Sequence, residues 1–300
     1  MIEVIDLWRS FGPVEALRGL NLRVPEGSAF ALIGTNGAGK TTTIKVVMNL
    51  LRPSSGSVRV LGIDSRRLAP RDLAHIGYVA DRQNLPGRLQ AGQYLDYVRR
   101  FYPSWDRSLE RSLLSELSVP LQRPIAHLSH GMRLKLALVA ALAFRPRLLV
   151  LDEPLGGLDP LVRDELMGGL LRQADAMTIF ISSHELAEIE GMVTHVGLLD
   201  DGRLLVQEPT SELAARLREI RVVFDHEAIV PATAPTEWLH LQAVGNVLSF
   251  VDTQYSEEAT HSRIAAVLGA TRAVDVQPMA LRAMFTTLTR ATRSALGDGG

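Results

Sequence analysis

A glycine-rich segment between two regular patterns constrains the fold of this chain most. Residues 34 to 41 read Gly-Thr-Asn-Gly-Ala-Gly-Lys-Thr, after the apolar run Ala29 to Ile33 and before the helical pattern Thr42 to Leu50. Glycine lacks a Cβ atom, so consecutive backbone N–H groups can turn inward around anionic oxygens, while the next helix directs its positive end at the same place. The spacing and its strand-to-helix context predict a phosphate-binding loop in an α/β fold.

Two side chains at the end of this loop carry its expected chemistry. Lys40 is expected to reach the β and γ phosphates of a nucleotide, and the hydroxyl of Thr41 to ligate Mg²⁺. The other contacts expected with the nucleotide come from Gly34, Thr35, Asn36, Gly37, Ala38, Gly39 and Thr42. A glycine-rich turn that merely contains a lysine is the alternative, and the flanking strand and helix argue against it. The loop alone names no reaction, because several classes of phosphate-transferring and mechanical proteins use it.

A second motif is an apolar strand, Leu148 to Leu151, that ends in the adjacent acids Asp152 and Glu153. Side chains alternate across a strand, so the two carboxylates can hold different tasks. Asp152 is expected to support Mg²⁺, usually through water, and Glu153 to orient and polarise the attacking water as a general base. Two solvated acids at the end of a strand are the alternative, which loses weight beside the phosphate loop.

Composition bounds the remaining possibilities. The chain has 300 residues, 46% hydrophobic and 22% charged, enough to bury one large core and a smaller second one. Its 32 Lys and Arg are balanced by 33 Asp and Glu, so no overall field favours nucleic acid or acidic lipid. The absence of cysteine excludes disulfides, thiolate metal sites and thiol nucleophiles. The longest apolar run, Leu136 to Phe144, is less than half of the about 20 residues that a membrane-spanning helix needs.

The pattern along the chain changes twice. Residues 84–145 are interpreted as a helical insertion, because prolines separate their helical stretches, and strand character returns after residue 147. From about residue 220 the pattern predicts further strands and helices, with a hairpin turn at Gly245-Asn246. We therefore expect a first domain over residues 1–215, with its helical subdomain at about 84–145, and a small accessory α/β domain over residues 216–300.

One further motif carries a resemblance. Leu128-Ser129-His130-Gly131-Met132 lies upstream of the paired acids and is similar to the signature sequence of ABC ATPases. Phe11, the turn Gly157-Leu158-Asp159 and His184 follow the order of other landmarks of that family. The resemblance covers residues 1 to about 208 and implies a phosphate-loop, RecA-like core with a helical subdomain, which uses ATP and Mg²⁺.

The resemblance also assigns roles to these residues. Phe11 would stack on adenine, although a phenylalanine packed in the core is the alternative. Ser129 and Gly131 would contact the γ phosphate held by an opposite subunit, which implies a head-to-tail dimer with two ATP molecules, and Asp159 would lie at that interface. His184 would contact the γ phosphate and help to hold the attacking water. From the residues alone, Ser129 is also a plausible helix N-cap, and a lone histidine is more often structural.

Two segments depart from the family pattern. His130 and Met132 stand where the usual signature has Gly and Gln. Asp81 occupies the position of a metal-contacting glutamine, and Gln83 follows two residues later, so both remain candidates for the metal.

An aromatic stretch follows these candidates, from Tyr94 through Tyr97, Phe101 and Tyr102 to Trp105. Packing of a helical core is one interpretation, and a groove that receives a helix from a membrane partner is the other. In ABC transporters this region contacts the permease.

Together these features predict the ATP-hydrolysing subunit of an ABC transporter. The signature, the segment Pro103 to Asp106 and the accessory domain resemble subunits paired with ABC-2-type export permeases. We expect such an integral membrane permease as partner, a second ATPase subunit, identical or not, and a location at the cytoplasmic face of the cell membrane. A non-transport ABC ATPase acting on nucleic acid or ribosomes is the alternative, but one phosphate loop without heptads or a basic tail gives no reason to expect nucleic acid. A phosphate-loop kinase or GTPase would leave the signature and His184 without a role.

Overall fold

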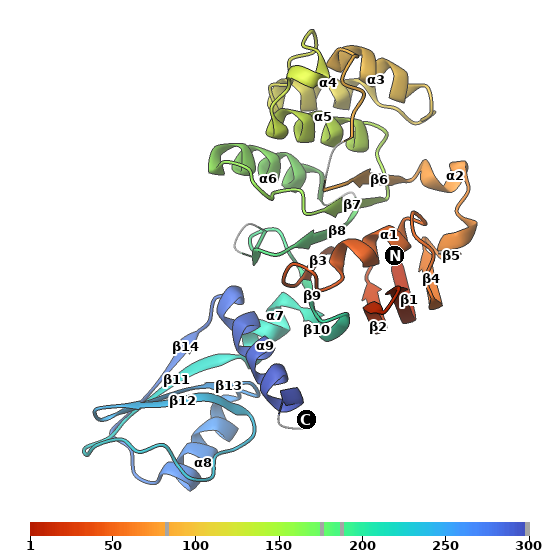
Figure 1. The fold of residues 1–300 in the computed structure, drawn as a ribbon. Coiled ribbons are helices and arrows are strands. Elements are labelled where there is room, and N and C mark those ends of the chain that lie inside the picture. Colours follow the sequence, from red (N-terminus) through yellow and green to blue (C-terminus); the bar gives the residue numbers. More distant parts are fainter. Residues whose placement is uncertain (82–83, 175–176, 187–188, 298–300) are drawn as a thin grey trace. The chain divides into compact units, whose positions relative to one another are not determined.

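The computed structural model describes residues 1–81, 84–174, 177–186 and 189–297 (Figure 1). It divides into two compact units, Met1–Gln207 and Glu208–Gly300. The boundary thus lies eight residues before the expected start of the second domain at residue 216. The intervening helix α7 (Thr210–Arg216) belongs to the second unit, because the Arg216 side chain donates hydrogen bonds to Glu208 and to the carbonyl of Thr253.

A six-stranded sheet forms the centre of the first unit. Its order is β10 (Arg203–Pro209), β9 (His195–Asp200), β3 (Ala29–Ile33), β8 (Thr178–Ser183), β7 (Leu148–Asp152) and β6 (Ile76–Val79). The five strands from β9 to β6 run parallel to their neighbours. Strands β3, β7 and β8 are buried at every position, as central strands covered on both faces should be. The α/β fold expected from the sequence is confirmed.

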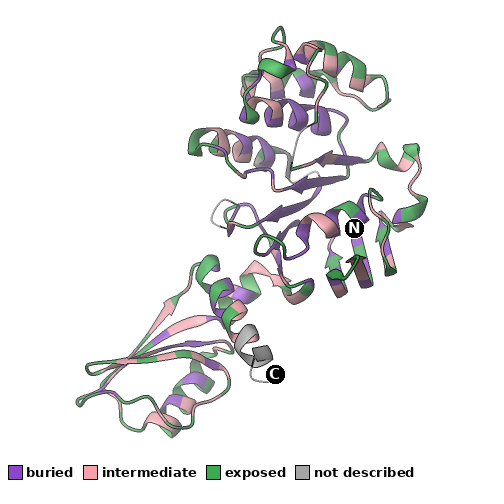
Figure 2. Cartoon of the chain, viewed as in Figure 1, coloured by how far each residue is buried: buried purple, intermediate pink, exposed green. Residues whose placement is uncertain are grey.

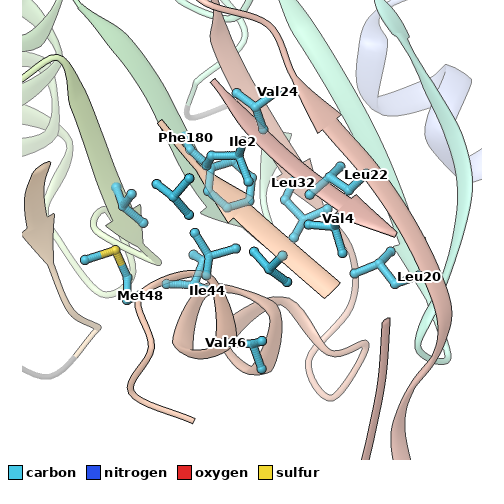
Figure 3. Packing of buried hydrophobic residues seen from close by; sticks show 14 of the residues in the cluster. Ile2, Val4, Leu20, Leu22, Val24, Leu32, Ile44, Val46, Met48 and Phe180 are labelled. Carbon is cyan, nitrogen blue, oxygen red and sulfur yellow. The ribbon is translucent and has the colours of Figure 1, made fainter. Parts of the chain in front are cut away.

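An antiparallel sheet lies beside this one in the first unit. Its strands are β2 (Val14–Val24), β1 (Ile2–Phe11), β4 (Ser55–Val60) and β5 (Ile63–Asp64). Residues of this sheet, of β3 and of α1 (Lys40–Val47) share one hydrophobic core, in which Figure 3 shows Ile2, Leu32 and Ile44 close together. The core therefore holds both ends of the phosphate loop.

Helices fill the segment between β6 and β7. They are α3 (Ala91–Arg99), α4 (Arg107–Glu116) and α5 (His130–Leu142). The short helix α2 (Pro70–Leu73) lies before β6. Helix α5 is buried at most positions and packs against β6, α3 and α4 (Figures 1 and 2). Residues 84–145 contain helices and no strand beyond one isolated bridge between Gln90 and Pro124. Helix α6 (Pro160–Ala174) follows β7.

The second unit is an antiparallel sheet with helices. Its order is β12 (Trp238–Val244), β13 (Val247–Asp252), β11 (Arg218–Val223) and β14 (Ala273–Pro278), with α8 (Glu257–Leu268) and α9 (Leu281–Gly297). The predicted hairpin turn is confirmed, and Gly245 adopts a φ of 59° there. Trp238 stacks on Phe250, with ring centroids 4.1 Å apart, at the centre of this unit's own core. None of the helices in the described residues is long and apolar enough to cross a membrane.

Candidate active site

The loop between β3 and α1 has a backbone that only glycine fits at two points. Gly39 adopts a φ of 108°, and a Cβ atom there would lie 2.7 Å from the carbonyl oxygen of Ala16. A Cβ atom on Gly34 would lie 2.3 Å from the carbonyl oxygen of Leu199. Both contacts are with backbone atoms, which cannot move aside as a flexible side chain can. These glycines therefore allow the loop to pass close to β2 and β9.

Lys40, the first residue of α1, turns its ammonium group back over the loop. Its Nζ atom donates to the carbonyl oxygens of Gly34 at 2.7 Å and Thr35 at 3.1 Å. It also forms an ion pair with Glu153, at 3.0 Å from Oε1, and its side chain is 5% exposed. A nearly buried cation thus lies at the loop, compensated entirely by oxygen atoms.

Asp152 at the end of β7 connects two hydroxyl groups. Its Oδ1 atom accepts from the hydroxyl of Thr41 at 3.0 Å and from that of Ser182 at 2.8 Å. Burial, together with the charges of Asp81 and Glu153, raises the pKa of the Asp152 carboxyl despite the two hydrogen bonds. The sequence motifs of the loop and of the paired acids therefore meet directly in space.

Glu153 follows in a left-handed backbone conformation, with a φ of 47°. Its Oε2 atom lies 2.6 Å from Nδ1 of His184, which donates because an ionised carboxylate only accepts. Burial alone would raise the pKa of Glu153, but the hydrogen bonds and charges of His184 and Lys40 outweigh it and hold the pKa below its ordinary value. Glu153 is therefore an anion at neutral pH, flanked by a lysine and a histidine.

These residues surround one pocket of about 330 Å³. It is lined by Asn36, Gly37, Gly39, Lys40, Thr41, Thr42, Asp81, Glu153, Gly156 and His184. Asp81, one of the two metal candidates, thus reaches the pocket, whereas Gln83 lies outside the described residues. The loop, Glu153 and His184, predicted from separate motifs, come together around one polar cavity.

Phe11, at the end of β1, is 47% exposed, so it is not a core residue. The guanidinium of Arg9 lies over its ring, 4.5 Å from the centroid, and is held there by a hydrogen bond to the carbonyl of Arg52. Phe11 pairs with Val14 at the start of β2, the strand whose Ala16 contacts Gly39. The exposed ring therefore lies at the turn of the hairpin that β1 and β2 form, but it does not line the pocket.

The signature segment lies apart from this pocket. Ser129 caps α5 by accepting a hydrogen bond from the backbone N–H of Met132 at 3.2 Å, which is the structural role considered for it. Asp159 likewise accepts from the N–H of Val162 at the start of α6. A Cβ atom on Gly131 would lie 3.0 Å from Cγ1 of Val162, so this glycine allows α5 and α6 to approach closely. Ser129, Gly131 and Asp159 do not line the pocket formed by the described residues of the same chain.

The aromatic stretch divides between the two interpretations. Tyr102 stacks on Phe144 with centroids 3.9 Å apart, and Trp105 donates to the carboxylate of Glu110, so these two rings belong to the helical core. Tyr97 and Phe101 are 55% and 61% exposed and contact each other edge to face. Within the aromatic stretch, Tyr97 and Phe101 are the pair that presents an apolar surface to solvent.

Two residues at the site, Ser182 and Tyr78, belong to no motif that the sequence reveals. Ser182 bonds to Asp152, and burial with the charges of Asp152 and Asp81 raises the pKa of Tyr78 to about 12. The registers β7 with β8 and β6 with β7 bring these side chains near the acids. The carboxyl ends of neighbouring parallel strands meet at one edge of a sheet, so the position of Ser182 near the end of its strand could have indicated that it lies beside Asp152.

Comparisons with known proteins place these features in context. A family model described as ABC transporter matches residues 17–156. The bacitracin transport ATP-binding protein BcrA of Bacillus licheniformis is 32% identical over 224 residues, which cover 73% of this chain and 73% of that protein. A solved ATP-binding subunit of an ABC transporter is similar, with a TM-score of 0.65 and 29% identity over 72% of this chain and 92% of that one. A dimeric ATP-binding cassette in a post-hydrolysis state, bound to ADP and phosphate, shares the fold with a TM-score of 0.63 and 22% identity, over 70% of this chain and 98% of that one.

Proposed function

This chain belongs to the ABC transporter family and is an ATPase, and we propose that it hydrolyses ATP in the pocket of the phosphate loop to drive export through a separate membrane protein. The observation that carries this proposal is the convergence of Lys40, Glu153 and His184 on one pocket of about 330 Å³. BcrA, the bacitracin transport protein described above, supports transport as the process that hydrolysis drives.

The pocket residues suggest how hydrolysis proceeds. Backbone N–H groups of the loop and the end of α1 bind the phosphates, and Lys40 exchanges its contact with Glu153 for oxygens of the γ phosphate. Glu153, ionised at neutral pH, is then free to accept a hydrogen bond from the attacking water and polarise it. His184 holds the second oxygen of Glu153 and thereby fixes the direction of the first.

The donor set next to the loop fits Mg²⁺. The Thr41 hydroxyl and the Asp152 carboxylate lie within hydrogen-bonding distance of each other, at 3.0 Å, and Asp81 lines the same pocket. All three offer oxygen ligands, and Mg²⁺ typically takes one or two protein ligands beside phosphate oxygens and water. Among the described residues, no group of three or more acidic, histidine or cysteine side chains could hold a metal without the nucleotide. Bound there, the ion would neutralise charge on the β and γ phosphates.

Completion of the site requires a second subunit in this proposal. Ser129 and Asp159 are exposed, and neither lines the pocket of its own chain within the described residues. Ser129 already accepts from the N–H of Met132, so an anion from outside would be bound by the N–H groups that precede Met132 at the start of the 13-residue helix α5. Two subunits arranged head to tail would bring Ser129 and Gly131 of one to the γ phosphate bound by Lys40 of the other.

The partner proposed for transport is an ABC-2-type permease. The exposed rings of Tyr97 and Phe101 on α3 and its C-terminal end offer an apolar, amphipathic anchor for a helix of that partner. The subunit would then work at the cytoplasmic face of the membrane. The transport proteins among its relatives favour this partner over DNA or the ribosome.

The substitution Glu153→Gln tests the catalytic part of the proposal. The variant keeps the shape of the side chain but cannot act as a base, so hydrolysis is expected to fall about 10²–10⁴-fold while ATP binding and dimer formation persist. Hydrolysis and light scattering at saturating ATP measure the two effects. Lys40→Ala is the matched variant that is expected to lose ATP binding.

Two outcomes would contradict the proposal. A Glu153→Gln protein that stays monomeric at saturating ATP would rule out the shared site. Consistent purification from membranes with ribosomes or DNA, instead of an integral membrane protein, would rule out transport.

A further inference from the structure

Ser182, near the end of β8, is completely buried and uses its hydroxyl group twice. Its Oγ atom donates to Oδ1 of Asp152 at 2.8 Å and accepts from the backbone N–H of Glu153 at 3.0 Å. The pairing of β7 with β8 places Asp152 directly opposite Ser182. One hydroxyl therefore contacts both acids of the proposed ATPase site, one through its side chain and one through its backbone.

The direction of each hydrogen bond is fixed. Asp152 is an acceptor when ionised, so the serine proton points at its carboxylate, and a lone pair is then left for the N–H of Glu153. The hydroxyl of Thr41 donates to the same Oδ1 atom. Two donors on one oxygen fix the rotation of the Asp152 carboxylate and the orientation of its second oxygen.

The hydrogen bond to the Glu153 backbone lies at a residue with an unfavourable backbone conformation. Glu153 has a φ of 47°, in the left-handed region that residues with a Cβ atom rarely adopt. Its backbone N–H would be unpaired without the serine, because the parallel pairing of β7 ends at Asp152. Ser182 thus supports the local conformation that turns the Glu153 side chain toward Lys40 and His184.

The neighbouring Ser183 makes a useful contrast. It is also buried, with 3% exposure, but its hydroxyl bonds, within the described part of the chain, to the backbone of Glu185 and to neither acid. Central parallel strands favour branched apolar residues, as at Ile179 and Ile181 of the same strand. Packing therefore gives no reason for a hydroxyl at position 182, whereas the two acids do.

We propose that Ser182 is a positioning residue that couples the metal-supporting Asp152 to the general base Glu153. This inference rests on the ATPase site proposed above. Through Ser182, a change in the orientation of the Asp152 carboxylate is transmitted to the backbone from which Glu153 reaches the attacking water. The proposed role needs no contact with nucleotide or metal, because the hydroxyl acts through the two acids.

The test compares Ser182→Ala with Ser182→Thr, which keeps a hydroxyl, and with Ser183→Ala as the matched control. The first measurement is the affinity for a non-hydrolysable ATP analogue, in EDTA and across a Mg²⁺ titration. Ser182→Ala is expected to bind the analogue normally in EDTA but to need about 10-fold more Mg²⁺ for half of the metal-dependent gain in affinity. Its kcat should fall while its KM, measured at saturating Mg²⁺, stays near that of the wild type.

Ser182→Thr should restore the Mg²⁺ requirement, and Ser183→Ala should leave it unchanged. An unchanged Mg²⁺ requirement in Ser182→Ala, or a shift that Ser183→Ala matches, would overturn the inference. Loss of binding in EDTA would overturn it as well, since it would reveal a merely structural role.

Thr41→Ala separates this inference from the function on which it rests. If Thr41→Ala raises the Mg²⁺ requirement and Ser182→Ala does not, only the role of Ser182 is wrong. If Thr41→Ala leaves the requirement unchanged, the proposed metal site itself is wrong, and the role of Ser182 falls with it.

Discussion

Asp152 and Glu153 are adjacent residues, and the protein shifts the pKa values of their carboxyl groups in opposite directions. Burial raises the pKa of Asp152, with contributions from Asp81 and Glu153, while His184 and Lys40 lower that of Glu153 against the effect of burial. The opposite shifts follow from the direction of each side chain, toward the hydroxyls for Asp152 and toward the cations for Glu153. The site therefore keeps one carboxylate at a cost in stability and stabilises the other.

This cost predicts that Asp152→Asn stabilises the protein at neutral pH. Folding raises the pKa of Asp152 above its ordinary 3.8, so the folded state pays for the ionised carboxylate at pH values above the folded pKa. The amide keeps an oxygen for Thr41 and Ser182 without the charge. We expect a gain of about 0.5–2 kcal/mol at pH 7, as is common when a functional residue is removed.

Thermal unfolding between pH 7 and pH 4 measures this effect. The gain should shrink as the pH falls toward 3.8, because wild-type Asp152 then becomes protonated. Asp81→Asn, which removes an exposed carboxylate that lines the pocket, is the control and should change stability less. An Asp152→Asn protein that is less stable than the wild type at pH 7 would contradict the prediction.

At this scale the sequence predicts residues that belong to contiguous motifs. Lys40, Thr41 and Glu153 were located because each stands at a fixed offset within a short pattern in the chain. Ser182 was not, since its importance depends on the register between β7 and β8, which no local pattern encodes. The roles of Ser129 and Asp159 toward a nucleotide stay predictions, because they depend on a second chain.

The approach of α5 to β6 depends on a single glycine. A Cβ atom on Gly77 would lie 2.6 Å from the carbonyl oxygen of Ala141 and 2.8 Å from Cδ1 of Leu149. The backbone of the helical insertion thus rests almost directly on the sheet at this strand. The close contact explains how α5 is held to the sheet in which β7 ends at Asp152.

Gly77→Ala is therefore expected to destabilise the first unit. The added methyl group meets a backbone carbonyl that cannot rotate away, and such overpacking typically costs about 1–3 kcal/mol. Gly191→Ala is the control, because nothing lies within 4 Å of a Cβ atom there and its change should stay within about 0.5 kcal/mol. Chemical denaturation measures both, and equal stability of the two variants would refute the close contact.

Elements with a clear period were predicted, and those with a weak one were missed. Strand β14 is an edge strand with no buried position, and α7 has only seven residues, too few for a helical period. The apolar alternation of the sequence indicates a strand only over Ile2 to Leu7, the first part of β1, because the left-handed Asp6, with a φ of 43°, marks a bulge that interrupts the alternation. Burial on one face is what makes a period visible, and these segments have little of it.

At the scale of the whole molecule, each unit has a hydrophobic core of its own. The second unit also contains a completely buried carboxylate, Asp252. It accepts a hydrogen bond from the hydroxyl of Thr260 at 2.7 Å and another from the N–H of Gln254, and it forms an ion pair with Arg263 at 3.0 Å. These contacts join the end of β13 to α8. The sequence predicted two domains from composition and pattern, but the exact boundary depends on where α7 packs, which no pattern reveals.

Asp252→Ala should therefore destabilise the second unit and spare ATP binding. Removing one partner of a buried ion pair typically costs about 3–5 kcal/mol, and Arg263 would keep its longer pairing with Glu237, at 3.6 Å, in place of the one with Asp252. The nucleotide pocket is lined by residues of the first unit only, so affinity for ATP should stay within about 2-fold of the wild type. Calorimetric unfolding and nucleotide titration measure the two effects.

Asp275→Ala, an exposed position on β14 of the same unit, is the matched control and should change little. Loss of ATP binding in Asp252→Ala would show that the first unit does not hold its pocket independently.

The contacts of Lys40 have a consequence for which anions the pocket accepts. Its ammonium group is already surrounded by two carbonyl oxygens and a carboxylate, and most of its water has been removed. An arriving anion therefore does not meet a free cation. The ammonium group of Lys40 exchanges one set of oxygen partners for another when the anion binds. Small anions that offer few oxygens compete poorly with such an internal ligand, whereas a triphosphate presents many oxygens to the loop and to Lys40 at once. Selection for long polyphosphates thus begins with the contacts of Lys40 inside its own chain.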